Sequence, residues 1–242
     1  MNFPNNPTGY MPYPGEASAV AEALVEAAED GANIVACVDD AYTGLFYDDD
    51  VYKESLFSLI ADSHPRLTAI KVDGPTKEDY VWGFRLGFIT FSLQTEGDYD
   101  EAFTALERKV GGLIRGTISK CSTPSQSLLI HAMKSAGYEE EKYEKFFMLK
   151  ERYDELKRVL ENPEYAESFR PYPFNAGYFM CLELLHTDAE RLRKYLLEAY
   201  GVGIIAINER DLRIAFSCLE KEQIKDLFDI LYTAVRDLDI RD

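Results

Sequence analysis

The sequence of 242 residues is short of the residue types that build metal sites, disulfide frameworks and basic surfaces. It has only three histidines, and its four cysteines stand far apart without a CxxC pair: Cys37, Cys121, Cys181 and Cys218. This spacing argues against a zinc site or a disulfide scaffold and predicts reduced thiols in the core. Lysine and arginine number 26 against 43 aspartates and glutamates. The resulting net charge of −17 makes nucleic acid and anionic lipid poor partners.

Long apolar runs are also missing. No stretch approaches the roughly 18 residues of a membrane-spanning helix. Residues 1–4 lack the basic start and apolar stretch of a signal peptide, so we expect a cytoplasmic protein without a membrane partner. A hydrophobic content of 46% is nevertheless sufficient for a buried core. These properties favour a globular protein with a small-molecule partner.

Hydrophobic periodicity predicts an α/β architecture. The β-branched apolar run at 34–38 is typical of a strand buried on both faces. Further strands are expected at 67–72, 86–91, 177–184, 202–207 and 212–216. Helices are expected at 16–29, 99–113, from 123 onward, 139–160, 188–200 and 220–238. The patterns Thr187-x-x-Glu190 and Ser217-x-x-Glu220 predict capping boxes for the last two helices.

Polar residues follow two of the predicted strands. Asp39 closes the strand at 34–38, where open α/β sheets place ligand-binding groups, although helix-capping and loop carboxylates are common at such positions. Tyr42, three residues later, is either a functional phenol or a packing residue. Lys77 follows the strand at 67–72 and a Gly-Pro turn, and taken alone it has the character of a surface lysine.

Two arginines interrupt apolar segments. Arg85 stands between glycines in the run 82–88, and a guanidinium buried there needs an anionic partner such as phosphate. Arg213, within the predicted strand 212–216, poses the same problem, and either a core salt bridge or a substrate carboxylate answers it. The tetrapeptide at 6–9, which begins with Asn6 and reads NPTG, is by itself a turn.

These motifs in this order resemble the class I/II aminotransferases of PLP fold type I: NPTG, then DxAY, then a lysine with an arginine eight residues later, then an arginine in LRIAF. The resemblance extends over residues 2–224, and the segment 174–179 is similar to the small-domain strand that faces the family's active site. It implies the C-terminal part of the large-domain parallel sheet in residues 1–138 and a small α+β domain in residues 139–242. It also implies pyridoxal 5'-phosphate as cofactor, amino acid and 2-oxo acid substrates, and a homodimeric parent protein.

The resemblance assigns catalytic roles to three residues. Lys77 is implied to form a Schiff base with the cofactor and then to move the proton of the substrate. Asp39 is implied to keep the pyridine nitrogen protonated. Tyr42 is implied to hydrogen-bond the 3-oxygen of the cofactor together with Asn6.

Binding roles follow in the same way. Arg85 is implied to bind the cofactor phosphate, and Arg213 to hold the substrate α-carboxylate with Asn6. Family members carry a serine or threonine three residues before the lysine, where this sequence has Gly74. Thr76 offers one hydroxyl instead, so we expect a lower affinity for the cofactor.

The larger departure is at the start of the chain. Only five residues precede Asn6, where the family has a strand, which implies that about half of the large domain is absent. With it go a phosphate-binding turn at a helix N-terminus and an aromatic residue that stacks on the pyridine. We expect a fragment that is inactive alone, holds the cofactor weakly and associates through unpaired strand edges. The alternatives are a non-catalytic remnant, the aminotransferase-like sensor domain of a transcriptional regulator, or a PLP-dependent C–S lyase.

Overall fold

The computed structural model describes residues 1–239, which form two compact units. The first unit consists of residues 1–3, 12–44 and 52–140. The second consists of residues 4–11 and 45–51 and the chain from residue 141 onward. A domain boundary after residue 138 stays a prediction, and the last three residues of the predicted second domain lie outside the described residues. No sequence pattern indicates that the two short segments belong with the second unit.

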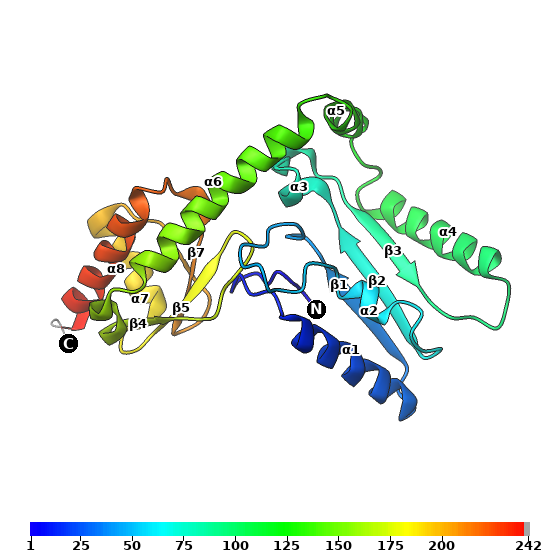
Figure 1. Ribbon diagram of the computed structural model, residues 1–242, viewed down its shortest axis with the longest axis horizontal. Coiled ribbons are helices and arrows are strands. Elements are labelled where there is room, and N and C mark those ends of the chain that lie inside the picture. Colours follow the sequence, from blue (N-terminus) through cyan, green and yellow to red (C-terminus); the bar gives the residue numbers. More distant parts are fainter. Residues whose placement is uncertain (240–242) are drawn as a thin grey trace. The chain divides into compact units, whose positions relative to one another are not determined.

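A three-stranded sheet forms the base of the first unit, with the order β1 (Ile34–Asp39), β2 (Leu67–Asp73) and β3 (Phe88–Ser92). β1 and β2 run parallel, with Asp39 opposite Val72. β3 is antiparallel to β2, with Phe88 opposite Asp73. The carboxyl ends of β1 and β2 and the start of β3 therefore lie at one edge of the sheet (Figure 1). The strands predicted for this unit are confirmed with small shifts of their ends.

One face of this sheet is covered by helices α1 (Pro14–Glu29) and α2 (Phe57–Ile60). The contact is built largely from small side chains, which allow close packing, and its buried members are Ala17, Ala21, Ala28, Ala36, Val38, Leu56, Ile60, Leu67 and Ala69. On β1 the side chains alternate, so that Val35 is 68% exposed and Cys37 is exposed. The prediction of a strand buried on both faces is therefore wrong, because no described residue packs over Val35.

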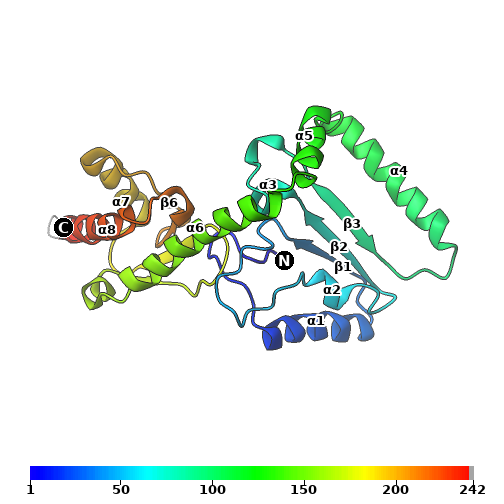
Figure 2. The same cartoon turned by 45° about the horizontal axis from the view of Figure 1, so that its top comes forward.

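Three further helices complete the first unit: α3 (Pro75–Glu78), α4 (Tyr99–Thr117) and α5 (Thr123–Met133). A 3-10 helix (Trp82–Phe84) precedes β3. Figures 1 and 2 both show α4 running beside β3. The helix predicted from residue 123 is confirmed, with Ser122 as its cap, since the Ser122 hydroxyl accepts from the backbone N–H of Ser125 at 3.3 Å. In the described part of the chain, no helix is long and apolar enough to cross a bilayer.

The second unit has an antiparallel sheet with the order β4-β5-β7-β6. Its strands are β4 (Phe169–Pro171), β5 (Met180–Leu184), β6 (Ile205–Ala206) and β7 (Asp211–Ile214). Its helices are α6 (Tyr138–Val159), which begins in the first unit, α7 (Ala189–Tyr195), a π-helical continuation (Leu196–Tyr200), α8 (Gln223–Asp239) and two 3-10 helices (Pro163–Glu167 and Phe216–Cys218). β4 was not predicted, and β6 is much shorter than the predicted strand at 202–207.

Both predicted capping boxes are wrong. α7 is capped by Asp188, one residue after Thr187, because the Asp188 carboxylate accepts the backbone N–H of Arg191 at 2.8 Å. α8 begins only at Gln223. Ser217 lies instead in the 3-10 helix before it, and Nη1 of Arg152 donates to the Ser217 carbonyl at 2.7 Å.

The four cysteines are free, as the sequence predicted. Only Cys181 is buried, whereas Cys37 and Cys218 are exposed and Cys121 is half-buried. The prediction that all four lie in the core is therefore wrong for three of them.

Asn175 joins separate segments of the second unit. Its side chain is 2% exposed, its Oδ1 accepts from the Met11 N–H at 2.7 Å, and its Nδ2 donates to the Met11 carbonyl at 2.9 Å. Its backbone N–H donates to the Gly9 carbonyl, and its carbonyl accepts from the Tyr47 N–H at 3.0 Å. One residue thus ties the segments 4–11 and 45–51 to the rest of the unit.

We expect Asn175→Ala to lower the free energy of unfolding by about 2–4 kcal/mol, because two buried backbone groups of Met11 lose their partners. Urea unfolding followed by circular dichroism measures the change. Asn33→Ala, at an exposed site, is the control and should stay within about 0.5 kcal/mol of wild type. Equal midpoints for the two variants would contradict the role given to Asn175.

Candidate functional site

Asp39 is the last residue of β1, and its side chain is exposed. Its Oδ1 accepts from the backbone N–H of Ala41 at 3.2 Å. Its own N–H donates to the Met1 carbonyl at 2.8 Å, and its carbonyl accepts from the Asn2 side chain at 3.0 Å. Hydrogen bonds of the Asp39 backbone N–H and carbonyl thus hold the end of the strand in place. The carboxylate stays accessible to a ligand.

Lys77 lies in α3, directly after β2. Its Nζ is 5.7 Å from the centroid of the Tyr42 ring, within the range of a cation–π contact, and Tyr42 itself is buried. Because β1 and β2 are parallel, the loops that follow them leave the sheet at the same edge. Asp39, Tyr42 and Lys77, which come from two separate motifs, therefore belong to one edge of the first unit.

Gly74, at the position where the family has a hydroxyl residue, is required by packing. A Cβ placed there would lie 2.7 Å from the carbonyl oxygen of Leu86 and 3.0 Å from Cα of Gly87. A serine at this position would therefore displace the chain that leads into β3. The hydroxyl of Thr76 donates to the same Leu86 carbonyl at 3.5 Å, which leaves its oxygen lone pairs able to accept.

The structure corrects the argument made for Arg85. This residue is exposed and follows the 3-10 helix in the left-handed conformation, with φ of 53°. It lies in a turn before β3 and not in a buried strand, so no buried guanidinium demands an anion there. A role in phosphate binding stays a prediction, and it now depends on the position of Arg85 at the same sheet edge as Lys77.

The second unit brings together Asn6 and Arg213, which are 207 residues apart. Nη1 of Arg213 donates to Oδ1 of Asn6 at 3.0 Å, and Cζ of Arg213 lies 4.3 Å from the centroid of the Phe179 ring. Nε of Arg213 is buried without a hydrogen-bond partner among residues 1–239. Within the same residues Arg213 forms no ion pair, which removes the alternative of a core salt bridge. The guanidinium keeps donor capacity for an anion.

The turn that carries Asn6 is held by residues that sequence reasoning missed. Gly9 has φ of 75°, its carbonyl accepts from the N–H of Asn175, and a Cβ there would overlap the carbonyl oxygen of Phe179. Sγ of Cys181 donates to the Pro7 carbonyl at 3.3 Å. Burial raises the pKa of the Cys181 thiol to about 12, which keeps it protonated as a donor. The missed partners are too distant in the chain to leave a local pattern.

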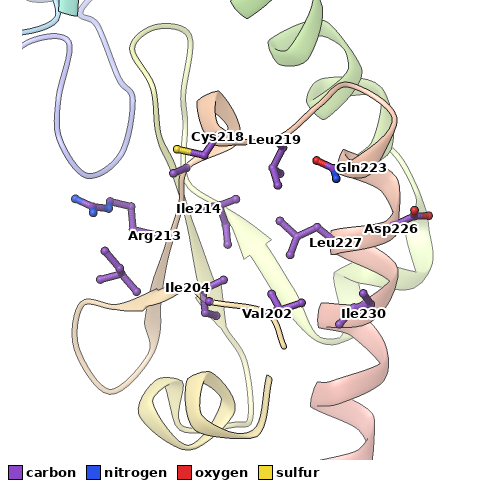
Figure 3. Close-up of a pocket in the computed structure, with 13 residues that line it drawn as sticks. Val202, Ile204, Arg213, Ile214, Cys218, Leu219, Gln223, Asp226, Leu227 and Ile230 are labelled. Atoms are coloured by element: carbon purple, nitrogen blue, oxygen red, sulfur yellow. The ribbon is translucent and has the colours of Figure 1, made fainter. Parts of the chain in front are cut away.

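Arg213 is one of the residues that line a cavity of about 530 Å³ in the second unit. Its lining is largely apolar and includes Ile214, Leu219 and Leu227. Figure 3 shows the Arg213 side chain extending from β7 to the side opposite Leu227 and α8. The guanidinium contacts Asn6 and the Phe179 ring, whereas Ile214, Leu219 and Leu227 supply apolar lining of the cavity.

Asp40, the neighbour of Asp39, has the opposite environment. It is 4% exposed, and its Oδ2 is buried without a hydrogen-bond partner among residues 1–239. Burial raises the pKa of this carboxyl above its ordinary value of 3.8, and a hydrogen bond with Ser55 opposes the rise only in part. Two adjacent carboxyl groups thus differ in exposure, and only Asp39 is accessible to a ligand.

The groups at the edge of the first unit fit pyridoxal 5'-phosphate by their chemistry. An accessible carboxylate suits a pyridinium, an amine suits an aldehyde, and an exposed guanidinium suits a phosphate. Asp39, Lys77 and Arg85 supply these three groups, and the ring of Tyr42 lies near the amine. The edge therefore offers one suitable group for each of these three parts of the cofactor.

Comparison with known proteins gave a family and many solved structures. The family model described as "Aminotransferase class I and II" matches residues 1–231. An aminotransferase from Anaerococcus prevotii superposes with a TM-score of 0.80 at 25% identity, over 97% of this chain and 56% of its own. For the α-aminoadipate aminotransferase LysN of Thermus thermophilus, complexed with N-(5'-phosphopyridoxyl)-L-leucine, the TM-score is 0.74 at 21% identity, over 98% and 58%.

An aspartate aminotransferase from Thermotoga maritima gives a TM-score of 0.71 at 18% identity, over 97% of this chain and 55% of its own. The chain thus spans little more than half the length of these structures. No curated protein matches the sequence. The predicted PLP fold type I, present with only part of the fold of the matched chains, is confirmed.

We expect Gly74→Ser to destabilise the first unit by about 1–3 kcal/mol, because its Cβ meets the backbone at Leu86. Gly83→Ser is a matched control nearby, since a Cβ at Gly83 meets nothing within 4 Å. Fluorescence of Trp82, the single tryptophan, reports urea unfolding of this unit. If the two variants unfold together, the approach of Leu86 to Gly74 is not a constraint.

We expect Asp40→Asn to raise the free energy of unfolding by about 1 kcal/mol at pH 7.5 and to have little effect below about pH 4. A carboxyl whose pKa is higher in the folded state holds its proton more firmly there, so the wild type loses stability as pH rises from 3.8 through the raised value.

Urea unfolding at a series of pH values measures the difference, with Asp30→Asn as the exposed control. A benefit of Asp40→Asn that does not change with pH would show that the Asp40 carboxyl is not the source.

Proposed function

The chain belongs to the class I and II aminotransferases, and from this premise we propose that the edge formed by β1 and β2 binds pyridoxal 5'-phosphate for amino-group transfer between an amino acid and a 2-oxo acid. Pyridoxal 5'-phosphate is the cofactor that the family membership implies. The observation that carries the proposal is the placement of Asp39 at the end of β1 and of Lys77 in the helix that directly follows the neighbouring parallel strand β2. Tyr42, near the Lys77 amine, supports it.

The proposed roles at this edge follow from the chemistry of the side chains. The bound cofactor would supply an electron sink for the carbanion that forms when the substrate Cα loses its proton. Nζ of Lys77 would hold the cofactor through its aldehyde and would move the proton of the substrate Cα. The Asp39 carboxylate would hold a proton on the pyridine nitrogen, and its exposure at the strand end leaves it accessible for this contact.

The phosphate and the 3-oxygen of the cofactor need separate partners. We assign the phosphate to Arg85, with Thr76 as an added hydroxyl. We assign the 3-oxygen to Tyr42, the residue of this unit that lies near the Lys77 amine. The close packing around Gly74 supports the assignment of Thr76, because it excludes the hydroxyl that the family carries at that position.

Arg213 and Asn6 are proposed to bind the α-carboxylate of the substrate. Their mutual hydrogen bond of 3.0 Å and the Phe179 ring against the guanidinium hold the donors in a fixed plane. A carboxylate accepts well from such a fork. The buried Nε without a described partner supports a ligand-binding role for the guanidinium.

The chain spans only 55–58% of the length of the solved structures compared above, so we also propose the location, assembly and activity of the whole protein. We propose a cytoplasmic homodimer of amino acid metabolism as the parent. We also propose that this chain alone holds the cofactor weakly and has little activity. The exposure of Val35 and of Ile89 (45%), which lie on the same face, supports this, since a sheet without cover on one face positions a ligand poorly.

Trapping of the cofactor on a lysine tests the assignment. The chain is incubated with pyridoxal 5'-phosphate and cyanoborohydride, and labelling of each lysine is measured by peptide mass spectrometry. We expect Lys77 to exceed the exposed Lys109 by roughly tenfold, the ratio that 1.4 kcal/mol of local binding provides. Lys77→Arg should abolish this label without raising that of Lys109. Equal labelling of Lys77 and Lys109 would contradict the proposed site.

A further inference from the structure

The turn that carries Lys77 has a partner far along the chain. Asp79 ends α3, and its backbone N–H donates to the Pro75 carbonyl at 2.9 Å. The hydroxyl of Tyr138, the first residue of α6, donates to Oδ1 of Asp79 across 59 positions of sequence. Both side chains are half-buried. A hydroxyl-to-carboxylate bond in such a setting is stronger than a bond between neutral groups.

The backbone on both sides of Lys77 is constrained. On the amino side, Gly74 packs against the Leu86 carbonyl and Pro75 is buried. On the carboxyl side, Tyr80 has φ of 57°, a left-handed conformation that is unfavourable for a tyrosine by about 1–2 kcal/mol. Such a conformation persists only where neighbouring contacts enforce it. The Tyr138–Asp79 bond lies immediately before this strained residue, on the side of the turn away from Gly74.

We propose that Tyr138 is a positioning residue for Lys77 and acts through Asp79. The inference rests on the function proposed for Lys77 above. Asp79 is two residues from Lys77 and closes the same helical turn, so a displacement of Asp79 rotates the turn and moves the amine relative to the Tyr42 ring and Asp39. No sequence motif marks Tyr138, and its role follows only from the contact with Asp79.

The same trapping reaction tests the proposal on the chain itself. The lysine nitrogen attacks the aldehyde carbon of pyridoxal 5'-phosphate, water leaves, and hydride from cyanoborohydride reduces the C=N bond to a stable secondary amine. The readout is the ratio of label on Lys77 to label on Lys109. We expect Tyr138→Phe and Asp79→Ala each to lower this ratio about fivefold, as expected for the loss of one charge-assisted hydrogen bond.

Two variants separate positioning from a general effect on the fold. Asp79→Asn keeps an acceptor oxygen for the Tyr138 hydroxyl and should retain the ratio within about twofold. Tyr143→Phe, at a residue of α6 that is 62% exposed, should leave it unchanged. The double variant Tyr138→Phe with Asp79→Ala should label no less than either single variant, because both remove the same bond.

The outcomes distinguish this inference from the function on which it rests. If wild-type Lys77 is not preferred over Lys109, the proposed function fails. If Lys77 is preferred and Tyr138→Phe retains the preference, the function stands and the positioning role is overturned. Loss of the preference in Asp79→Asn would also overturn the positioning role. So would a double variant whose labelling ratio falls by the product of the two single losses. Should Tyr138→Phe not fold by circular dichroism, Asp79→Ala and Asp79→Asn provide the same comparison.

Discussion

The parallel pairing of β1 with β2 is the constraint on which the candidate site depends. The packing of α1 buries Ala36 and Val38 on one face of β1, and the alternation of a strand then leaves Asp39 on the exposed face. A shift of the register by one residue would reverse these faces and bury the carboxylate. The parallel direction also brings the end of β2, and with it Lys77, to the edge where Asp39 lies. The packing of small side chains against β1 therefore determines which face of the sheet carries Asp39.

The second unit orients its site by the same alternation. Leu212 and Ile214 of β7 are buried, and Arg213 between them extends to the opposite side, where Asn6 and the Phe179 ring meet it. Hydrogen bonds then set the position of the Asn6 turn, because Asn175 binds both polar backbone groups of Met11. The substrate-binding groups proposed for this unit thus depend on the buried amide of Asn175, to which no role in the reaction is assigned.

Much of the secondary structure and the proposed site residues could be predicted from the sequence, because periodicity and the order of short motifs are local signals. The same signals failed where an answer depends on distant residues. An apolar run at β1 does not reveal whether both faces are covered, and the exposed Val35 shows that one is not. Arg85 was expected to carry a buried guanidinium at the entry to a strand, and it lies in an exposed left-handed turn. Asn175 contacts a residue 164 positions away, and Tyr138 contacts one 59 positions away, so no local sequence pattern indicates either contact.

The claim that one sheet edge assembles the cofactor site is tested most directly by a crystal structure of the chain after reductive trapping of pyridoxal 5'-phosphate. We expect the cofactor to be bonded to Nζ of Lys77, with its pyridine nitrogen within hydrogen-bond distance of the Asp39 carboxylate and its phosphate on Arg85. A cofactor bonded to Lys77 whose ring lies away from Asp39, or a cofactor bonded to other lysines, would contradict the account.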